Sequence, residues 1–158
     1  MNTRPSWQQY FMRMAFLAST RSTCIRRAVG AALVRDNQII STGYNGSPKN
    51  SPHCKDIGCL RQQNNVPSGE KHELCRGVHA EQNAIIQAAI NGNSTRNAVL
   101  YCTHQPCSIC AKMIINAEIR QVYVAESYPD QLSLELFQEA DVDLILFDHE
   151  TGESKRIV

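Results

Sequence analysis

The chain has no large excess of charge of either sign, no long apolar run and no recognisable export signal. Its 16 Lys and Arg residues balance 15 Asp and Glu residues, which gives a formal net charge of +1 at pH 7. A global basic field for binding nucleic acid is therefore missing, and small-molecule substrates are favoured. No stretch reaches the ~18 apolar residues of a membrane span. We therefore expect a cytoplasmic protein without nucleic-acid or membrane partners.

Internal repeats and low-complexity tracts are also absent. With 158 residues and 42% hydrophobic content, the chain can form one well-packed core but is too short for two ordinary domains. Residues 1–158 are therefore expected to form a single domain. The seven cysteines are an odd number in a chain without an export signal, and we expect reduced thiols or metal ligands.

Apolar periodicity predicts strands that alternate with helices after an initial hairpin. The pair Asp36-Asn37 fits a tight turn, and a helix between the last two strands implies that these run parallel. The expected fold is α/β, with a mixed five-stranded sheet and helices on both faces. The expected elements are helix 6–22, strands 29–35 and 38–44, a long loop 45–77, a helix from His79 to Asn91, strand 98–103, a helix after Cys107, strand 121–125, helix 131–140 and strand 142–147.

Two short motifs supply the ligands of a catalytic zinc site. His79-Ala80-Glu81 and Pro106-Cys107-Ser108-Ile109-Cys110 offer one imidazole and two thiolates, and a catalytic zinc takes three protein ligands and a water. His79, Cys107 and Cys110 are therefore the expected ligands. Glu81 is too close in sequence to His79 to ligate the same ion easily, but it can shuttle the proton of the bound water. This combination is the signature of zinc deaminases.

Each motif alone has a simpler interpretation. A Cys-x-x-Cys pair is more often a structural zinc site or a redox pair, and His-x-Glu alone carries little information. A structural site would require a fourth side-chain ligand and would leave Glu81 without a role. The joint occurrence of both motifs, with a strand leading directly into Pro106, therefore favours catalysis.

The chain resembles the cytidine deaminase superfamily, and most closely its deoxycytidylate (dCMP) deaminases of the bacterial competence-operon and phage type. The resemblance covers nearly the whole chain. The loop Gly43-Tyr44-Asn45-Gly46-Ser47-Pro48 is its more specific element and separates the chain from tRNA adenosine deaminases, whose substrate would also require a basic surface. The other residues that carry it are Val29-Gly30-Ala31, His79 to Ala84, Leu100-Tyr101, Pro106-Cys107, Cys110 and Tyr128-Pro129-Asp130.

This resemblance implies the three-layer cytidine deaminase-like fold and the hydrolysis of dCMP to dUMP and ammonia, which supplies dUMP for dTMP synthesis. Zinc-activated water would attack C4 of cytosine, and Glu81 would protonate N3 and then the leaving amine. Asn45 would bind the sugar hydroxyl and Tyr128 would lie against the nucleotide, although Asn45 alone also fits a simple turn residue. The resemblance further implies a homo-oligomer, such as a hexamer, with dCTP and dTTP as effectors and Mg²⁺ beside the regulatory nucleotide.

The segment 45–77 exceeds the ~12 to 15 residues usual for an unstructured loop, so a functional or mobile role is expected. It contains Cys54, Cys59 and Cys75, which together with Cys24 are enough for a second, structural zinc. By the family resemblance, His53 or His72 could replace Cys59 or Cys75. The alternative is four reduced cysteines without metal.

Three alternatives to dCMP deamination remain open at this stage. The substrate could be CMP, dCTP or deoxycytidine, or the chain could be a zinc-stabilised accessory module without turnover, against which the intact Glu81 argues. Selection of a nucleotide requires a cationic or donor-rich pocket beyond the ribose. Arg26 is the first candidate for this phosphate contact, and the others are Arg27, Ser47, Lys49 or a residue of a neighbouring subunit.

Overall fold

The computed structural model describes residues 3–158 and begins with helix α1 (Trp7–Ser19). The helix starts at Ser6, whose hydroxyl accepts a hydrogen bond from Gln9 N while the Gln9 side chain accepts one from Ser6 N. This reciprocal capping satisfies two amide groups that the first helical turn leaves unpaired. None of the helices within residues 3–158 has the length and apolar character that crossing a membrane requires.

Six strands form one mixed sheet in the order β2-β1-β3-β4-β5-β6. The hairpin β1–β2 turns at Asp36 and Asn37, whose positive φ angles of 51° and 56° match a two-residue turn of the type that hairpins favour. Strand β3 runs antiparallel to β1, whereas β3, β4 and β5 are mutually parallel. The parallel pairing of the last two predicted strands, β4 and β5, is thereby confirmed. The strands are β1 (Gly30–Arg35), β2 (Gln38–Tyr44), β3 (Val99–His104), β4 (Gln121–Glu126), β5 (Asp143–Phe147) and β6 (Ser154–Arg156).

Strand β6 is the one strand that the sequence analysis did not predict. It pairs antiparallel with β5 at the edge of the sheet, and all three of its side chains are exposed. An exposed Ser-Lys-Arg strand has no apolar alternation, so the periodicity gave no indication of it.

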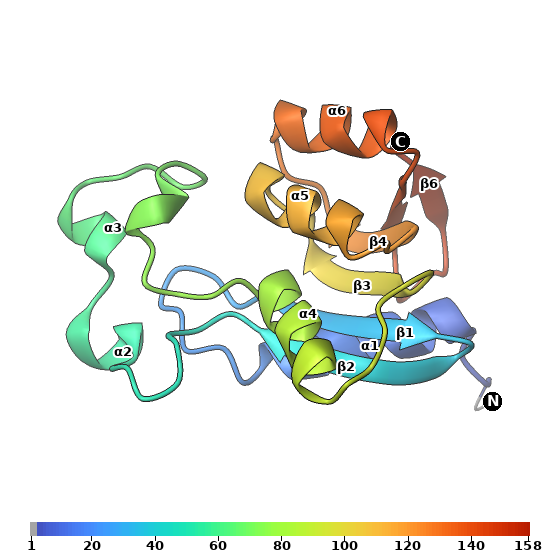
Figure 1. The fold of residues 1–158 in the computed structure, drawn as a ribbon, viewed down its shortest axis with the longest axis horizontal. Coiled ribbons are helices and arrows are strands. Elements are labelled where there is room, and N and C mark those ends of the chain that lie inside the picture. The colour runs from blue at the N-terminus through green and yellow to red at the C-terminus, as the bar shows by residue number, and fades with distance from the viewer. Residues whose placement is uncertain (1–2) are drawn as a thin grey trace.

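The sheet is the middle layer of a three-layer fold (Figure 1). Helix α1 packs on β1 and β3 from one face, and α4 (Ala80–Ile90), α5 (Ser108–Asn116) and α6 (Gln131–Glu139) lie over the other. Side chains alternate accordingly along β1: Ala31 and Leu33 pack with α4 and α5, whereas Ala32 and Val34 pack with α1. Helices therefore cover both faces, as expected.

The segment between β2 and α4 extends away from the sheet (Figure 1). It contains two short helices, α2 (Cys54–Ile57) and α3 (Leu60–Gln63), and the 3₁₀ turn η1 (His72–Leu74). An isolated bridge between Gly46 and Val78 joins the two ends of the segment. This closure places the segment beside the starts of α4 and α5, where the predicted metal ligands lie.

Candidate metal and active site

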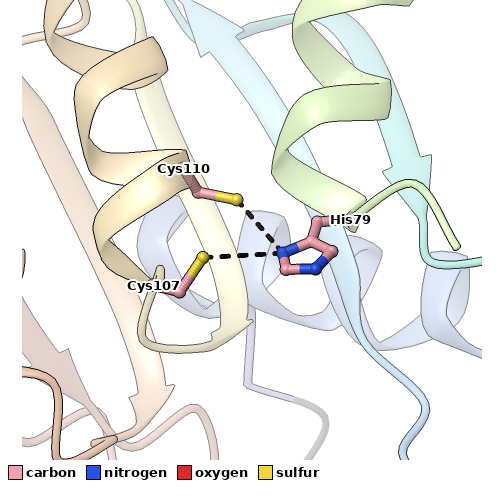
Figure 2. Close-up of side chains that lie close together, drawn as sticks. All are labelled: His79, Cys107 and Cys110. Atoms are coloured by element: carbon pink, nitrogen blue, oxygen red, sulfur yellow. Dashed lines mark hydrogen bonds between the residues drawn. The ribbon is translucent and has the colours of Figure 1, made fainter. Parts of the chain in front are cut away.

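His79, Cys107 and Cys110 converge at one point (Figure 2). The Nδ1 atom of His79 lies 3.6 Å from Cys107 Sγ and 3.3 Å from Cys110 Sγ, and the three ligand groups lie within 4.8 Å of one another. Tetrahedral zinc with ordinary bond lengths separates nitrogen and sulfur ligands by about 3.6 Å. The three side chains therefore fit a single zinc ion, which would have its fourth position open.

Two helix starts hold these ligands. His79 and Cys107 directly precede α4 and α5, and Cys110 lies in the first turn of α5. The backbone N–H of His79 donates to the Gln82 side chain, and Ser108 N donates to the Asp130 carboxylate at 2.8 Å. The partial positive charge at both helix starts favours thiolates at this position.

The protonation of the cluster also fits a cation. The pKa of Cys107 falls to about 4, chiefly because Cys110 hydrogen-bonds to its sulfur, and the same bond raises the pKa of Cys110. Hydrogen bonds with Cys107 and Cys75 raise the pKa of His79 to about 10. The ligands thus share protons around a thiolate, and a divalent metal ion replaces such protons when it binds.

Glu81 lies beside this cluster without belonging to it. Only 4% of its surface is exposed, and it lines the cavity that opens onto the ligands. Burial raises the pKa of its carboxyl group, and the positive charge of His79 opposes the rise. A buried carboxyl group next to a metal site is suited to accept and return a proton.

The cavity brings together all three predicted substrate contacts, Asn45, Tyr128 and Arg26. Asn45 Oδ1 accepts hydrogen bonds from Ser22 Oγ at 2.5 Å and Val29 N at 2.9 Å, and Nδ2 donates to the carbonyl of Arg27 at 2.8 Å. Asn45 therefore fixes the 22–29 loop against β2. One Nδ2 hydrogen is left for a ligand, because an amide has two.

Tyr128 also lines the cavity. Its backbone N–H donates to Gln105 Oε1 at 3.1 Å, and the Arg27 guanidinium lies 5.8 Å from the ring centroid. Its hydroxyl packs so tightly on Gly69 that a Cβ there would lie 1.9 Å away, and Gly69 has a φ of +83°. Only glycine fits this contact, which places the tip of the long segment on Tyr128.

A family model described as the cytidine and deoxycytidylate deaminase zinc-binding region matches residues 5–126. The chain belongs to this deaminase family. It is 45% identical over 140 residues to ComE operon protein 2 of Bacillus subtilis, covering 88% of this chain and 70% of that protein. It is 42% identical over 144 residues to the deoxycytidylate deaminase of Schizosaccharomyces pombe, covering 89% of this chain and 44% of the relative. The resemblance found in the sequence is thereby confirmed.

The fold is also similar to that of a deaminase of known structure. The dCMP deaminase of cyanophage S-TIM5, in complex with dCMP and dUMP, superposes with a TM-score of 0.74 at 29% identity, covering 90% of this chain and 98% of that one. The predicted cytidine deaminase-like fold is therefore confirmed. The chain spans about half the length of the two yeast deoxycytidylate deaminases that it matches.

Several residues that the sequence analysis did not place at the site also line the cavity, among them Arg61, His72, His104 and Gln105. Both ring nitrogens of His72 are buried without a hydrogen-bond partner, as is Gln105 Nε2. The His72 ring meets His79 edge-on, with centroids 5.2 Å apart. The periodicity of the sequence does not indicate these residues, because their place in the cavity depends on how the long segment folds back.

The four cysteines of the predicted second zinc site also line this cavity. Burial raises the pKa of Cys54, and the nearby thiols of Cys24, Cys59 and Cys75 add to the rise. Cys75 also lies beside His79, which lowers the pKa of the Cys75 thiol. Within residues 3–158, however, the single close-packed group of potential ligands is that of His79, Cys107 and Cys110.

The phosphate candidates separate into two groups. Arg26 and Arg27 line the cavity, whereas Ser47 and Lys49 are not among its lining residues. Arg26 also donates to the carbonyl of Val66 at 3.4 Å, which links the loop before β1 to the long segment. Arg26 and Arg27 are therefore better placed than the other candidates to contact an anion in the cavity.

Proposed function

We propose that the protein is a zinc-dependent hydrolase that converts dCMP to dUMP and ammonia. The observation that carries this proposal is the cluster of His79, Cys107 and Cys110 with the buried carboxyl group of Glu81 beside it, in the wall of a cavity. Relatives named deoxycytidylate deaminase support the choice of substrate, as does the cyanophage enzyme that was solved with dCMP and dUMP.

His79, Cys107 and Cys110 would hold the zinc ion, which supplies a water of lowered pKa at neutral pH. Glu81 carries the protons in the mechanism. Its carboxylate accepts a proton as the water oxygen adds to C4 and delivers this proton to N3. It then takes the hydroxyl proton at C4 and passes it to the amine, so that ammonia leaves and a carbonyl remains.

The remaining cavity residues bind the nucleotide in this proposal. The spare Nδ2 hydrogen of Asn45 is available for the sugar hydroxyl, and the Tyr128 ring provides a flat surface for the nucleotide. Arg26 faces the same cavity and is suited to an anionic group. The product dUMP would enter dTMP synthesis.

We also propose that the protein is a regulated homo-oligomer in the cytoplasm. Large apolar side chains exposed on α1, such as Trp7 at 46% and Leu17 at 60%, support a homo-oligomer, for which a hexamer is the family's example. Regulation by dCTP and dTTP with Mg²⁺ rests on the family resemblance. A cytoplasmic location agrees with a metal site that requires reduced thiols.

An ammonia-release assay with zinc-loaded protein tests the function directly. We expect turnover of dCMP with a kcat/KM well above those for CMP, deoxycytidine and dCTP. Preference for deoxycytidine or dCTP would change the substrate assignment. Absence of turnover on all four substrates would favour a zinc-stabilised accessory module.

We also propose a second zinc at Cys24, Cys54, Cys59 and Cys75, supported by the fact that all four line one cavity and that the other three thiols contribute to the raised pKa of Cys54. Elemental analysis of metal-replete protein is expected to give two zinc ions per chain. Cys54→Ser should lower this count to one and make segment 45–77 more susceptible to proteolysis, because the ion connects distant parts of the segment. Lys55→Ala, at the exposed neighbouring position, should change neither result. One zinc in the unmodified protein would contradict the second site.

A further inference from the structure

The carboxylate of Asp130 holds the first amide groups of two helices. One oxygen accepts a hydrogen bond from Ser133 N at 3.0 Å, in the first turn of α6. The other accepts from the backbone N–H of Ser108, the first residue of α5, at 2.8 Å. The two helices pack side by side on one face of the sheet (Figure 1). One side chain therefore joins the start of α6 to the turn that carries the metal ligand Cys107.

Helix α5 needs this outside acceptor because of its metal ligand. Cys107 occupies the N-cap position of α5, where a side-chain oxygen usually accepts a hydrogen bond from the first helical turn. It presents a sulfur instead, which lies 3.6 Å from Nδ1 of His79. A helix start without an oxygen acceptor leaves its first amide groups unpaired. Asp130 supplies the acceptor from α6 and leaves the sulfur to the metal ion.

A second contact restrains the same turn from the other side of Cys107. Ser133 Oγ donates to the carbonyl of Pro106 at 2.7 Å, and both residues are fully buried. The carbonyl before Cys107 and the amide after it are thus both hydrogen-bonded to the start of α6. Because the backbone sets the direction of the Cα–Cβ bond, these two contacts determine where the sulfur points.

We propose that Asp130 is a positioning residue of the metal centre: by holding Ser108 N, it directs the Cys107 sulfur toward the zinc ion. This inference deepens the proposed function and rests on the zinc site that the function requires. Groups that orient metal ligands without touching the ion typically change metal affinity by about 10- to 100-fold when they are replaced. Asp130 takes no part in the proton transfers, which belong to Glu81.

Asp130→Ser separates this role from ordinary helix capping. Serine is also a good N-cap, so it can still accept from Ser133 N, but its single oxygen cannot serve Ser108 N as well. We expect zinc affinity, measured by competition with a chelator, to fall about 10- to 100-fold. Asp130→Ala should show the same loss of affinity, and its zinc-loaded form should unfold about 2 to 4 °C below that of the Ser variant, because the cap of α6 is lost too.

Cobalt(II) bound in place of zinc reports on the ligands directly. Its visible bands change with coordination geometry, and its thiolate bands report whether the sulfurs are bound. We expect Asp130→Ser to shift or weaken these bands. Asp148→Ala is the matched control, since the Asp148 carboxylate also accepts two backbone hydrogen bonds, from Glu150 N at 2.8 Å and Thr151 N at 3.1 Å. Asp148 is not among the cavity residues, so its loss should leave the zinc affinity and the cobalt bands unchanged.

Unchanged zinc affinity and cobalt bands in Asp130→Ser would overturn the proposal and leave Asp130 as the N-cap of α6. Equal changes in Asp148→Ala would also overturn it, because they would reflect a general loss of stability. Neither measurement requires turnover. An unmodified protein that binds zinc but deaminates no substrate would therefore refute the proposed function and not the role of Asp130. Should the Ser variant unfold, Asp130→Asn allows the same comparison, since its amide has one acceptor oxygen for two N–H groups.

Discussion

Replacing Glu81 with Gln is expected to leave the zinc content unchanged while lowering kcat by about 10²- to 10⁴-fold. The amide has nearly the same shape as the carboxyl group, so the buried position beside His79 stays filled. It cannot accept the proton of the attacking water, however, and both later transfers, to N3 and to the amine, then lack a donor. Metal analysis combined with steady-state kinetics on dCMP measures the two parts of this expectation.

Cys107→Ala is the matched comparison for Glu81→Gln. It removes a ligand, so zinc and turnover should be lost together. A Gln variant with near-normal kcat would disprove the role of Glu81 as proton carrier. A Gln variant that loses zinc would instead make Glu81 part of the metal site.

Gly43→Ala is expected to destabilise the protein by about 3 kcal/mol or more, which for a chain of this size lowers Tm by about 6 to 12 °C. A Cβ at this position of β2 would lie 2.2 Å from the Ala80 carbonyl oxygen and 2.6 Å from Ala84 N. Both are backbone atoms of α4, so relief requires moving the helix that follows His79 and contains Glu81. We therefore expect weaker zinc binding as well, measured by competition with a chelator.

The neighbouring Thr42→Ala provides the control for Gly43→Ala. Thr42 lies on the same strand with its side chain exposed, so this change should alter stability by at most about 1 kcal/mol. Zinc affinity should be unchanged. If Gly43→Ala unfolds at the temperature of the unmodified protein, the close contact between β2 and α4 does not constrain the site.

The sequence was sufficient for the main elements and the ligand cluster because both depend on short-range patterns. Apolar alternation identified β1 to β5, and the two motifs identified His79, Cys107 and Cys110, whose residue types leave few alternatives at a zinc ion. Asn45 shows the limit of such reasoning. Its amide supports the 22–29 loop, and Asn45 also lines the cavity, so a structural role and the proposed sugar contact are compatible at one position.

The other cavity residues depend on how the long segment folds back. Nothing in the residues around Arg61 distinguishes a solvated arginine from a buried one, and its burial follows from contacts with Pro67 and the cavity wall. Gln105 is similar, because its role in holding Tyr128 joins positions 23 residues apart. Such long-range contacts leave no periodic trace in the sequence.

The spacing of the metal ligands along the chain also affects how the protein folds during its synthesis. Cys107 and Cys110 are separated from His79 by 28 and 31 residues, and β3 lies between them, so the three ligands meet only when the starts of α4 and α5 are brought together. Zinc that binds only the closed site shifts the folding equilibrium by mass action, by about 1.4 kcal/mol for each tenfold excess over its dissociation constant. Chains synthesised under zinc limitation would therefore populate open forms, whose seven thiols are exposed to oxidation.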